Sequence, residues 1–535
     1  MASANNASAR GANEWWEELV LFVVVAHVVL CPFSKVEESF NTQAVHDALF
    51  VEDLGAWDHR TYPGTVPRTF LGALAVAAVY NAASLVHAPL ARLCPRASGA
   101  ALRWLAGAAP PDGPPLLAKQ VLARLALAAL WFYGFRRFAG GARRRFGRGA
   151  AAWLCALSAA QFHGPFYASR FLPNSLAMPL VLYAYGEGLS GRRGRGLALI
   201  GAATAAVRCD LLALAAPLGA AWCLRPSGER APLLAVGVPC ALLGAGVAAA
   251  LSVGADTYLW ASETWLWPEG AVLLYNNPSD GRSSAWGTLP AHWYATSALP
   301  RALGGALPLA ALGMAYEPAR CGADLGLPAV ASVGLLSLLP HKELRFVFPA
   351  LPLLTLCAAV GADRLWRRDA KRIKRAGPRA LIRRSVPLGL AALTLGAAVL
   401  FSAAARNNYP GGVALRALHD RWGGDLGHAA IVHVDDRAAT SGVSRFGEEM
   451  RGSGWTYDKR DGLLDFDAFD YRLAELPLAG DAADFDVLAE VYAYAGLKPD
   501  EAFPFLKMET APAIAILRHK RHRGVRVPEP LRISA

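Results

Sequence analysis

Two adjacent glutamates, Glu37 and Glu38, follow the first apolar segment of the chain and lie beside Lys35. A carboxylate that faces a substrate hydroxyl in a partly dry cleft can accept its proton as that hydroxyl attacks. Neighbouring residues on a helix point about 100° apart, so we expect only one of the two to face a substrate. The alternative is that both are interfacial charges flanking a helix, and these residues alone leave the choice open.

A short basic run, His341-Lys342-Glu343-Leu344-Arg345-Phe346, lies between two apolar segments. On a helix, His341, Lys342 and Arg345 would share one side, because residue 345 lies four positions after 341 and three after 342. Ammonium and guanidinium groups bind phosphate well, so these side chains are candidates for holding a phosphate group. The alternative is a short basic hinge between two membrane spans.

Other polar residues stand out against apolar surroundings. Arg170 and Asn174 lie in the run Ser169–Asn174, and Arg208 precedes Cys209 and Asp210 inside a long apolar stretch. Each arginine is a candidate to bind an anion or to be an ion partner within the fold. The remaining candidate substrate-binding residues are Asp58, His59, Trp265, Trp267, Glu269, Trp286 and His292. Their aromatic rings suit sugar stacking, but an aromatic belt at a membrane interface explains them equally well.

The sequence contains no phosphate-binding glycine loop, no dinucleotide fingerprint and no zinc-type spacing. Asp465-Phe466-Asp467 has the spacing of a metal-binding pair, but its acidic neighbours favour a solvated surface. The eight cysteines form no CxxC pair and mostly lie in apolar segments, which favours buried thiols over disulfides. We therefore expect neither a metal nor a cofactor.

Apolar segments separate these candidate residues. Hydrophobic residues make up 54% of the 535 residues and charged residues only 18%, whereas soluble domains carry about 25% charged residues. A membrane span takes about 20 apolar residues. The candidate spans are 19–33, 116–135, 150–168, 172–189, 197–224, 233–253, 303–316, 327–339, 346–365 and 386–405. The sequence therefore predicts an all-α polytopic membrane protein.

The net charge of +12 comes largely from basic runs between the spans, at 136–148, 192–195 and 367–384. The positive-inside rule places such runs in the cytosol, so we expect a membrane and no nucleic-acid partner. Segment 197–224 is expected to be two helices meeting at an elbow, which keeps Arg208 and Asp210 away from the bilayer centre. With segment 70–90 as a non-spanning lumenal helix, about eleven spans put every candidate site residue in the lumen.

The chain changes character at residue 406. The tail is polar, lacks cysteine, and mixes short apolar runs with Gly, Asp and Pro. We expect two domains: a transmembrane catalytic domain over residues 1–405, with a lumenal loop over 34–69, and a small soluble lumenal α/β domain over 406–535.

Three runs, Lys35–Asn41, Ser169–Asn174 and His341–Phe346, resemble motifs of the dolichyl-phosphate-mannose-dependent mannosyltransferases of the GT-C type, glycosyltransferase family 22. Other members carry His-Pro-Asp-Glu where this chain has Lys35-Val36-Glu37-Glu38, so Glu37 stands at the aspartate position and is the favoured base. Further runs resemble the branch that forms α-1,6 bonds: Asp58–Phe70, Trp265–Gly270, Trp286–Thr288, Val432–Asp435 and Thr440–Phe446.

The resemblance implies a GT-C fold and an inverting transfer of mannose in the endoplasmic-reticulum membrane, with a lumenal active site. The donor would be dolichyl-phosphate mannose, and the acceptor the 6-hydroxyl of a mannose on the seven-mannose, dolichyl-diphosphate-linked oligosaccharide. Glu37 or Glu38 would be the base, and His341, Lys342, Arg345 and Arg208 would hold the donor phosphate. The alternatives are an α-1,2-mannosyltransferase of the same family and, from another class, a transporter, which the absence of visible internal repeats disfavours.

Overall fold

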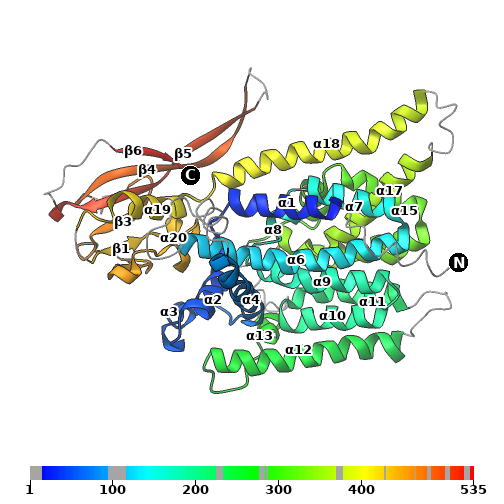
Figure 1. The fold of residues 1–535 in the computed structure, drawn as a ribbon, viewed down its shortest axis with the longest axis horizontal. Coiled ribbons are helices and arrows are strands. Elements are labelled where there is room, and N and C mark those ends of the chain that lie inside the picture. The colour runs from blue at the N-terminus through cyan, green and yellow to red at the C-terminus, as the bar shows by residue number, and fades with distance from the viewer. Residues whose placement is uncertain are drawn as a thin grey trace.

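Helices between residues 15 and 406 pack side by side in a bundle, and a β-sheet lies at one end of it (Figure 1). The computed structural model describes residues 15–93, 116–223, 233–275, 284, 287–368, 378–426, 429–463, 465–478, 483–500, 506–522 and 530–535. The longer bundle helices are α1 (Trp15–Leu30), α4 (Leu71–Leu93), α6 (Leu116–Phe146), α7 (Arg148–Ala160), α9 (Pro173–Leu189), α10 (Arg193–Ala206), α11 (Leu212–Cys223), α12 (Val238–Leu259), α15 (Ala306–Tyr316), α16 (Leu327–Ser337), α17 (Ala350–Arg368) and α18 (Pro378–Arg406).

The other bundle helices lie between these along the chain. They are α2 (Ser39–Phe50), α3 (Asp58–Thr61), α8 (His163–Tyr167), α13 (Pro268–Tyr275) and α14 (Leu299–Leu303). Figure 1 shows α2, α3 and α4 at the end of the bundle that also carries the sheet, here called the domain-bearing end. One continuous buried core joins side chains from α1 to α17, so apolar burial holds the helices together.

Three helices in the described part of the chain are long and apolar enough to cross a membrane by themselves: Ala235–Leu259, Pro318–Ser337 and Arg384–Arg406. A fourth candidate is the pair Tyr294–Leu303 and Ala306–Tyr316, which is bent by 98°. The predicted span 303–316 is thus the second half of this bent pair, and the bend lies at Gly304, whose φ of 52° suits glycine. By length and composition, the described residues show fewer independent spans than the predicted eleven.

The predicted break in segment 197–224 is confirmed. Helix α10 ends at Ala206, Arg208 is extended, and a 3₁₀ turn over Cys209–Leu211 leads into α11. The break leaves backbone groups without helical partners, and the N–H of Cys209 is satisfied by the carboxylate of Glu269 at 2.7 Å. The elbow thereby presents Arg208 and Asp210 outside both helices.

Residues after α18 form a six-stranded sheet of order β2-β1-β3-β5-β4-β6. Its strands are β1 (Ile431–Val434), β2 (Thr456–Asp458), β3 (Tyr471–Glu475), β4 (Phe485–Pro499), β5 (Leu506–His519) and β6 (Leu531–Ser534). Strand β1 runs parallel to β2 and β3, whereas β4 and β5 form a long antiparallel hairpin. Helices α19 (Pro410–Trp422) and α20 (Asp436–Thr440) accompany the sheet, and α19 joins its separate buried core.

Candidate functional site

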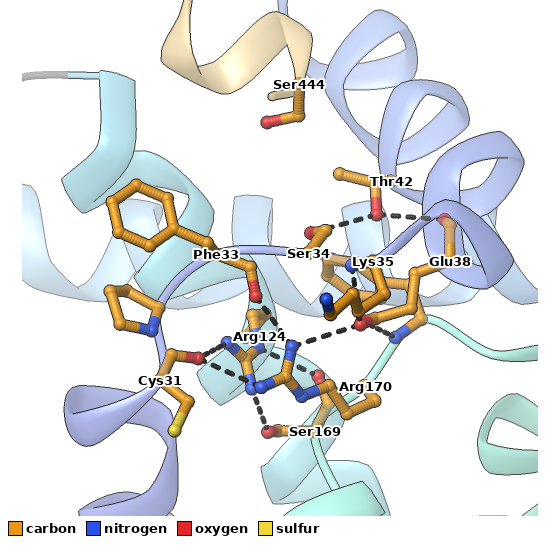
Figure 2. Close-up of polar contacts among 12 residues, drawn as sticks. Cys31, Phe33, Ser34, Lys35, Glu38, Thr42, Arg124, Ser169, Arg170 and Ser444 are labelled. Atoms are coloured by element: carbon orange, nitrogen blue, oxygen red, sulfur yellow. Dashed lines mark hydrogen bonds and ion pairs between the residues drawn. The ribbon is translucent and has the colours of Figure 1, made fainter. Parts of the chain in front are cut away.

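The acidic pair lies on a 3₁₀ turn, Val36–Glu38, between α1 and α2. Glu38 points inward and is only 3% exposed. Its Oε1 lies 3.0 Å from Nη1 of Arg170, and its Oε2 accepts the backbone N–H of Phe171 at 3.1 Å (Figure 2). Glu38 also accepts the backbone N–H of Lys35 at 3.2 Å. All of these contacts use the side-chain oxygens of Glu38 to fix the loop.

Glu37 has the opposite environment. Its side chain is exposed, and among the described residues its carboxylate makes no hydrogen bond or ion pair. Burial lowers the pKa of the neighbouring Lys35, while the negative charge of Glu37 acts to raise that pKa. Of the two candidate bases, Glu37 is therefore the carboxylate that an incoming hydroxyl can reach.

Two buried arginines shape the loop that precedes the pair. Arg170 donates from Nη1 to the carbonyl of Phe33 at 2.6 Å and from Nη2 to the carbonyl of Cys31 at 3.2 Å. Arg124, from the N-terminal third of α6, also donates to the carbonyl of Cys31, and to Oγ of Ser169 at 3.1 Å. Figure 2 shows both guanidinium groups beneath this stretch of chain. The sequence analysis missed Arg124, although a charged residue inside a predicted span was the available signal.

The run Ser169–Asn174 connects this loop to the elbow. Arg170 and Phe171 hold Glu38, as above, and Nδ2 of Asn174 donates to Oδ2 of Asp210 at 3.2 Å. The same Asp210 oxygen accepts Nε of Arg208 at 3.0 Å. Residues predicted separately as candidates are thus joined by one short turn.

Three arginines meet beside the elbow. The guanidinium groups of Arg208 and Arg345 lie 5.5 Å and 6.0 Å from the ring centre of Phe346. Burial, together with the positive charges of Arg208 and Arg345, lowers the pKa of Arg68 to about 10. Like charges held together in this way are expected to favour an anion among them. Arg68 was not a predicted site residue, although it lies in the run Asp58–Phe70 that resembles the α-1,6 branch.

Carboxylates partly balance this cluster. Oε1 of Glu343 lies 2.6 Å from Nη2 of Arg345 and 3.0 Å from Nε2 of His341. Glu269 is buried, and burial raises its pKa, although the charge of Arg208 acts to lower it. The cationic group is thus already paired in part, so a bound phosphate would compete with or reorganise these pairs.

Lys342 behaves differently from its neighbours. Residues 341–343 precede the 3₁₀ turn Leu344–Val347, so the run does not form one helix with a shared face. The Lys342 side chain is buried, and its Nζ donates to the backbone carbonyls of Leu289, at 2.9 Å, and Leu339. In this geometry the ammonium group joins two loops.

Tyr167 is within electrostatic range of both the acidic and the basic groups. The charges of Glu37, Glu38 and Arg345 all act on its phenol group. Its ring also packs 4.7 Å from that of Phe348, just past the basic run. The candidate base and one arginine of the cluster thus act electrostatically on the same side chain.

The other predicted residues lie around this region or apart from it. Burial raises the pKa of Asp58, and Lys459 of the C-terminal domain is among the charges acting on it. His59 is enclosed by Trp57, Phe70 and Trp260, and its Nε2 lies 3.1 Å from the carbonyl of Leu259. His59 is thus a packing residue in this structure.

The predicted aromatic residues include both exposed side chains and side chains bonded within the fold. Trp265 is 84% exposed and, with Arg60 and Tyr258, lines a surface depression of about 540 Å³ beside the end of α12. Trp267 donates its indole N–H to the carbonyl of Ala205 at 2.7 Å. His292 is exposed and bonds Thr296, whereas Trp286 lies outside the described residues.

The sequence model of the Alg9-like mannosyltransferase family matches residues 18–411, which covers most of the helical bundle and every predicted site residue. The chain belongs to this family.

Three relatives of this mannosyltransferase carry the name Dol-P-Man:Man(7)GlcNAc(2)-PP-Dol alpha-1,6-mannosyltransferase. The Arabidopsis thaliana protein is 35% identical, covering 84% of this chain and 83% of its own length. The Drosophila melanogaster protein is 33% identical, and the alignment covers 94% of this chain and 70% of that protein. The Saccharomyces cerevisiae protein is 28% identical, and the alignment covers 86% of this chain and 84% of that protein.

Among solved structures, ArnT from Cupriavidus metallidurans bound to undecaprenyl phosphate is similar with a TM-score of 0.50. The alignment covers 84% of this mannosyltransferase and 87% of ArnT at 13% sequence identity. At this identity the likeness concerns the fold alone, and it places the bundle in the GT-C class.

Proposed function

We propose that this mannosyltransferase transfers mannose from dolichyl-phosphate mannose to the 6-hydroxyl of a mannose on the seven-mannose, dolichyl-diphosphate-linked oligosaccharide. The observation that carries the proposal is the division of the acidic pair: Arg170 immobilises Glu38, whereas Glu37 is exposed near Tyr167, on which Arg345 also acts. The names of the relatives support the donor, the acceptor and the α-1,6 linkage.

In the proposed reaction, Glu37 accepts the proton of the acceptor's 6-hydroxyl as that oxygen attacks the anomeric carbon of the donor mannose. The bond between this carbon and the phosphate oxygen breaks, and dolichyl phosphate leaves. A single displacement inverts the anomeric carbon, so a β-linked donor yields an α-linked product. Arg345 and Arg208, with Arg68 beside them, would stabilise the charge on the leaving phosphate, so the step needs no metal ion.

We further propose that the domain-bearing end faces the lumen of the endoplasmic reticulum and that about eleven segments cross its membrane. The dolichyl-linked substrates named for the relatives and the basic loops between the spans support this orientation. Short or charged helices can still cross where neighbouring segments cover their polar groups, as Cys31 and Ser169 cover Arg124 of α6. A glycosylation acceptor site engineered into an exposed loop of the sheet domain should be modified in microsomes; an unmodified site would contradict the orientation.

The decisive test is a transfer assay with the purified full-length chain, dolichyl-phosphate mannose and the seven-mannose acceptor. We expect one mannose to be added, and linkage analysis of the product to give an α-1,6 bond. An α-1,2 bond in the product would assign the chain to the alternative specificity within the family. No transfer of mannose to the seven-mannose acceptor would overturn the proposal.

A further inference from the structure

One segment of the C-terminal domain, Gly442–Phe446, packs into the helical bundle. Phe446 is fully buried and belongs to the core of the bundle, apart from the core of its own domain. Its ring packs edge-on against His46, with ring centres 5.0 Å apart, and against Phe50, at 6.1 Å. Both partners belong to α2, the helix that follows the acidic pair.

Two polar residues of this segment bond elements that flank the Glu37 loop. Ser444, which is 2% exposed, donates from Oγ to Oε1 of Gln120 at 2.8 Å. Gln120 in turn donates from Nε2 to the carbonyl of Pro32 at 2.8 Å and to Oγ of Ser34 at 3.0 Å. The chain of contacts therefore runs from the C-terminal domain, through α6, to the loop itself.

Arg445 reaches α2 directly. Its backbone N–H donates to Oε1 of Gln43 at 3.0 Å, and its Nη1 lies 2.7 Å from Oδ1 of Asp47. Asp47 is 1% exposed, and its Oδ2 accepts the backbone N–H of Asp58 at 2.7 Å. Both carboxylate oxygens of Asp47 therefore hold neighbouring segments together. A buried ion pair with these further hydrogen bonds holds one geometry, because each partner is costly to leave alone.

The loop is also packed from the same side. Phe33 lies against Gly412 of α19 and against Gly442, and a Cβ at Gly412 would come within 2.4 Å of the Phe33 ring. Gly442 has a φ of 124°, which side-chain-bearing residues rarely adopt. In Figure 2 the loop lies between Ser444 on one side and Arg124 and Arg170 on the other.

We propose that the Gly442–Phe446 segment is a positioning element for the reaction: Ser444, through Gln120, and Arg445, through Gln43 and Asp47, hold the loop that carries Glu37. The sheet domain then sets the distance between the base and the acceptor hydroxyl. The kinetic part of this inference rests on the proposed function, whereas the restraint on the loop does not. This positioning role accounts for the run Thr440–Phe446, which has no part in the proposed chemical step.

The test uses the full-length protein and two independent measurements. Hydrogen exchange of residues 33–38 should speed up in Ser444→Ala and in Arg445→Met, and should be largely restored in Arg445→Lys, which keeps a cation beside Asp47. In the transfer assay Ser444→Ala should lower kcat about tenfold with KM for both substrates unchanged, because a small misplacement of a catalytic group slows the chemical step. Arg416→Met, at an exposed ion pair with Asp420 in the same domain, is the matched control and should change neither measurement.

The outcomes separate the two proposals. Unchanged exchange at residues 33–38 in both Ser444→Ala and Arg445→Met would overturn the positioning role, whatever the activity. Faster exchange in a protein whose wild type transfers no mannose would leave the restraint standing and reject the proposed function. If Arg445→Met fails to fold, the milder Ser444→Ala decides, and normal kcat with faster exchange in that variant would remove the kinetic part.

Discussion

The guanidinium group of Arg170 lies 3.0 Å from the carboxylate of Glu38, and the two side chains are only 1% and 3% exposed. An isolated buried charge is strongly destabilising, so each partner requires the other. The pair therefore holds Glu38 in the fold, whereas the adjacent Glu37 is exposed. Two glutamates that look equivalent along the chain thus have different environments.

Replacing Glu37 with Gln should abolish most transfer while leaving the fold intact. A general base contributes about 10²- to 10⁴-fold, so we expect kcat to fall by at least about 100-fold. Because the Glu37 side chain is exposed, the melting temperature should stay close to that of the wild type. Turnover near the wild-type rate in this variant would exclude Glu37 as the base.

Replacing Glu38 with Gln should instead destabilise the protein. The buried Arg170 would lose its charged partner, and breaking such a pair lowers the free energy of unfolding by about 3 kcal/mol or more. Thermal unfolding of the purified protein measures this loss, with Glu37→Gln as the control. Adding Arg170→Met to Glu38→Gln should recover part of the stability, since no unpaired charge is then left. Equal stability of the two single variants would refute the division of roles.

Arg345 and Lys342 should differ although both belong to the predicted basic run. Arg345→Gln is expected to lower kcat/KM for the donor by about 100-fold, because it removes charge stabilisation from the leaving phosphate. Lys342→Met should mainly lower stability, because the Lys342 ammonium bonds two backbone carbonyls. Donor-dependence curves and melting temperatures for the two variants check this; a selective loss of donor affinity in Lys342→Met would place that lysine at the phosphate.

The C-terminal domain should lose stability in acid. Burial lowers the pKa of His419 to about 4 from its ordinary 6.5, and its Nε2 is hydrogen-bonded to the Tyr457 hydroxyl at 2.9 Å. His419 is therefore protonated below pH 6.5 in the unfolded chain, but only below about pH 4 in the folded chain. Stability falls across this range by up to about 3 kcal/mol.

Glu448 acts in the same direction. Burial opposes its ionisation, but Lys459 and Arg451 outweigh burial and lower its pKa, so its contribution is lost as the pH falls through that lowered value. Melting temperatures measured from pH 7.5 to 4.5 should therefore decline less steeply in His419→Gln than in the wild type, without becoming flat. Identical slopes in the two proteins would show that His419 is not a buried neutral histidine.

The amino-acid sequence determined the class of the molecule and most of the participants in its site. Apolar segments of limited length, with basic runs between them, require a helical bundle in a membrane, since only such helices satisfy their own backbone groups there. The break at Arg208–Asp210 followed from the penalty on charges inside an apolar stretch, and the helix termini confirm it. These are local properties, which composition and spacing record directly.

Only the tertiary structure decided how those residues divide their tasks. The choice between Glu37 and Glu38 depends on Arg170, which lies more than a hundred positions away in the chain and whose approach no local pattern records. The same holds for Arg124, Arg68 and Ser444, whose partners come from other helices or from the other domain. Burial and charge pairing are set by three-dimensional neighbours, so an exposed glutamate, a buried ion pair and a loop packed from two sides appear only once the chain is folded.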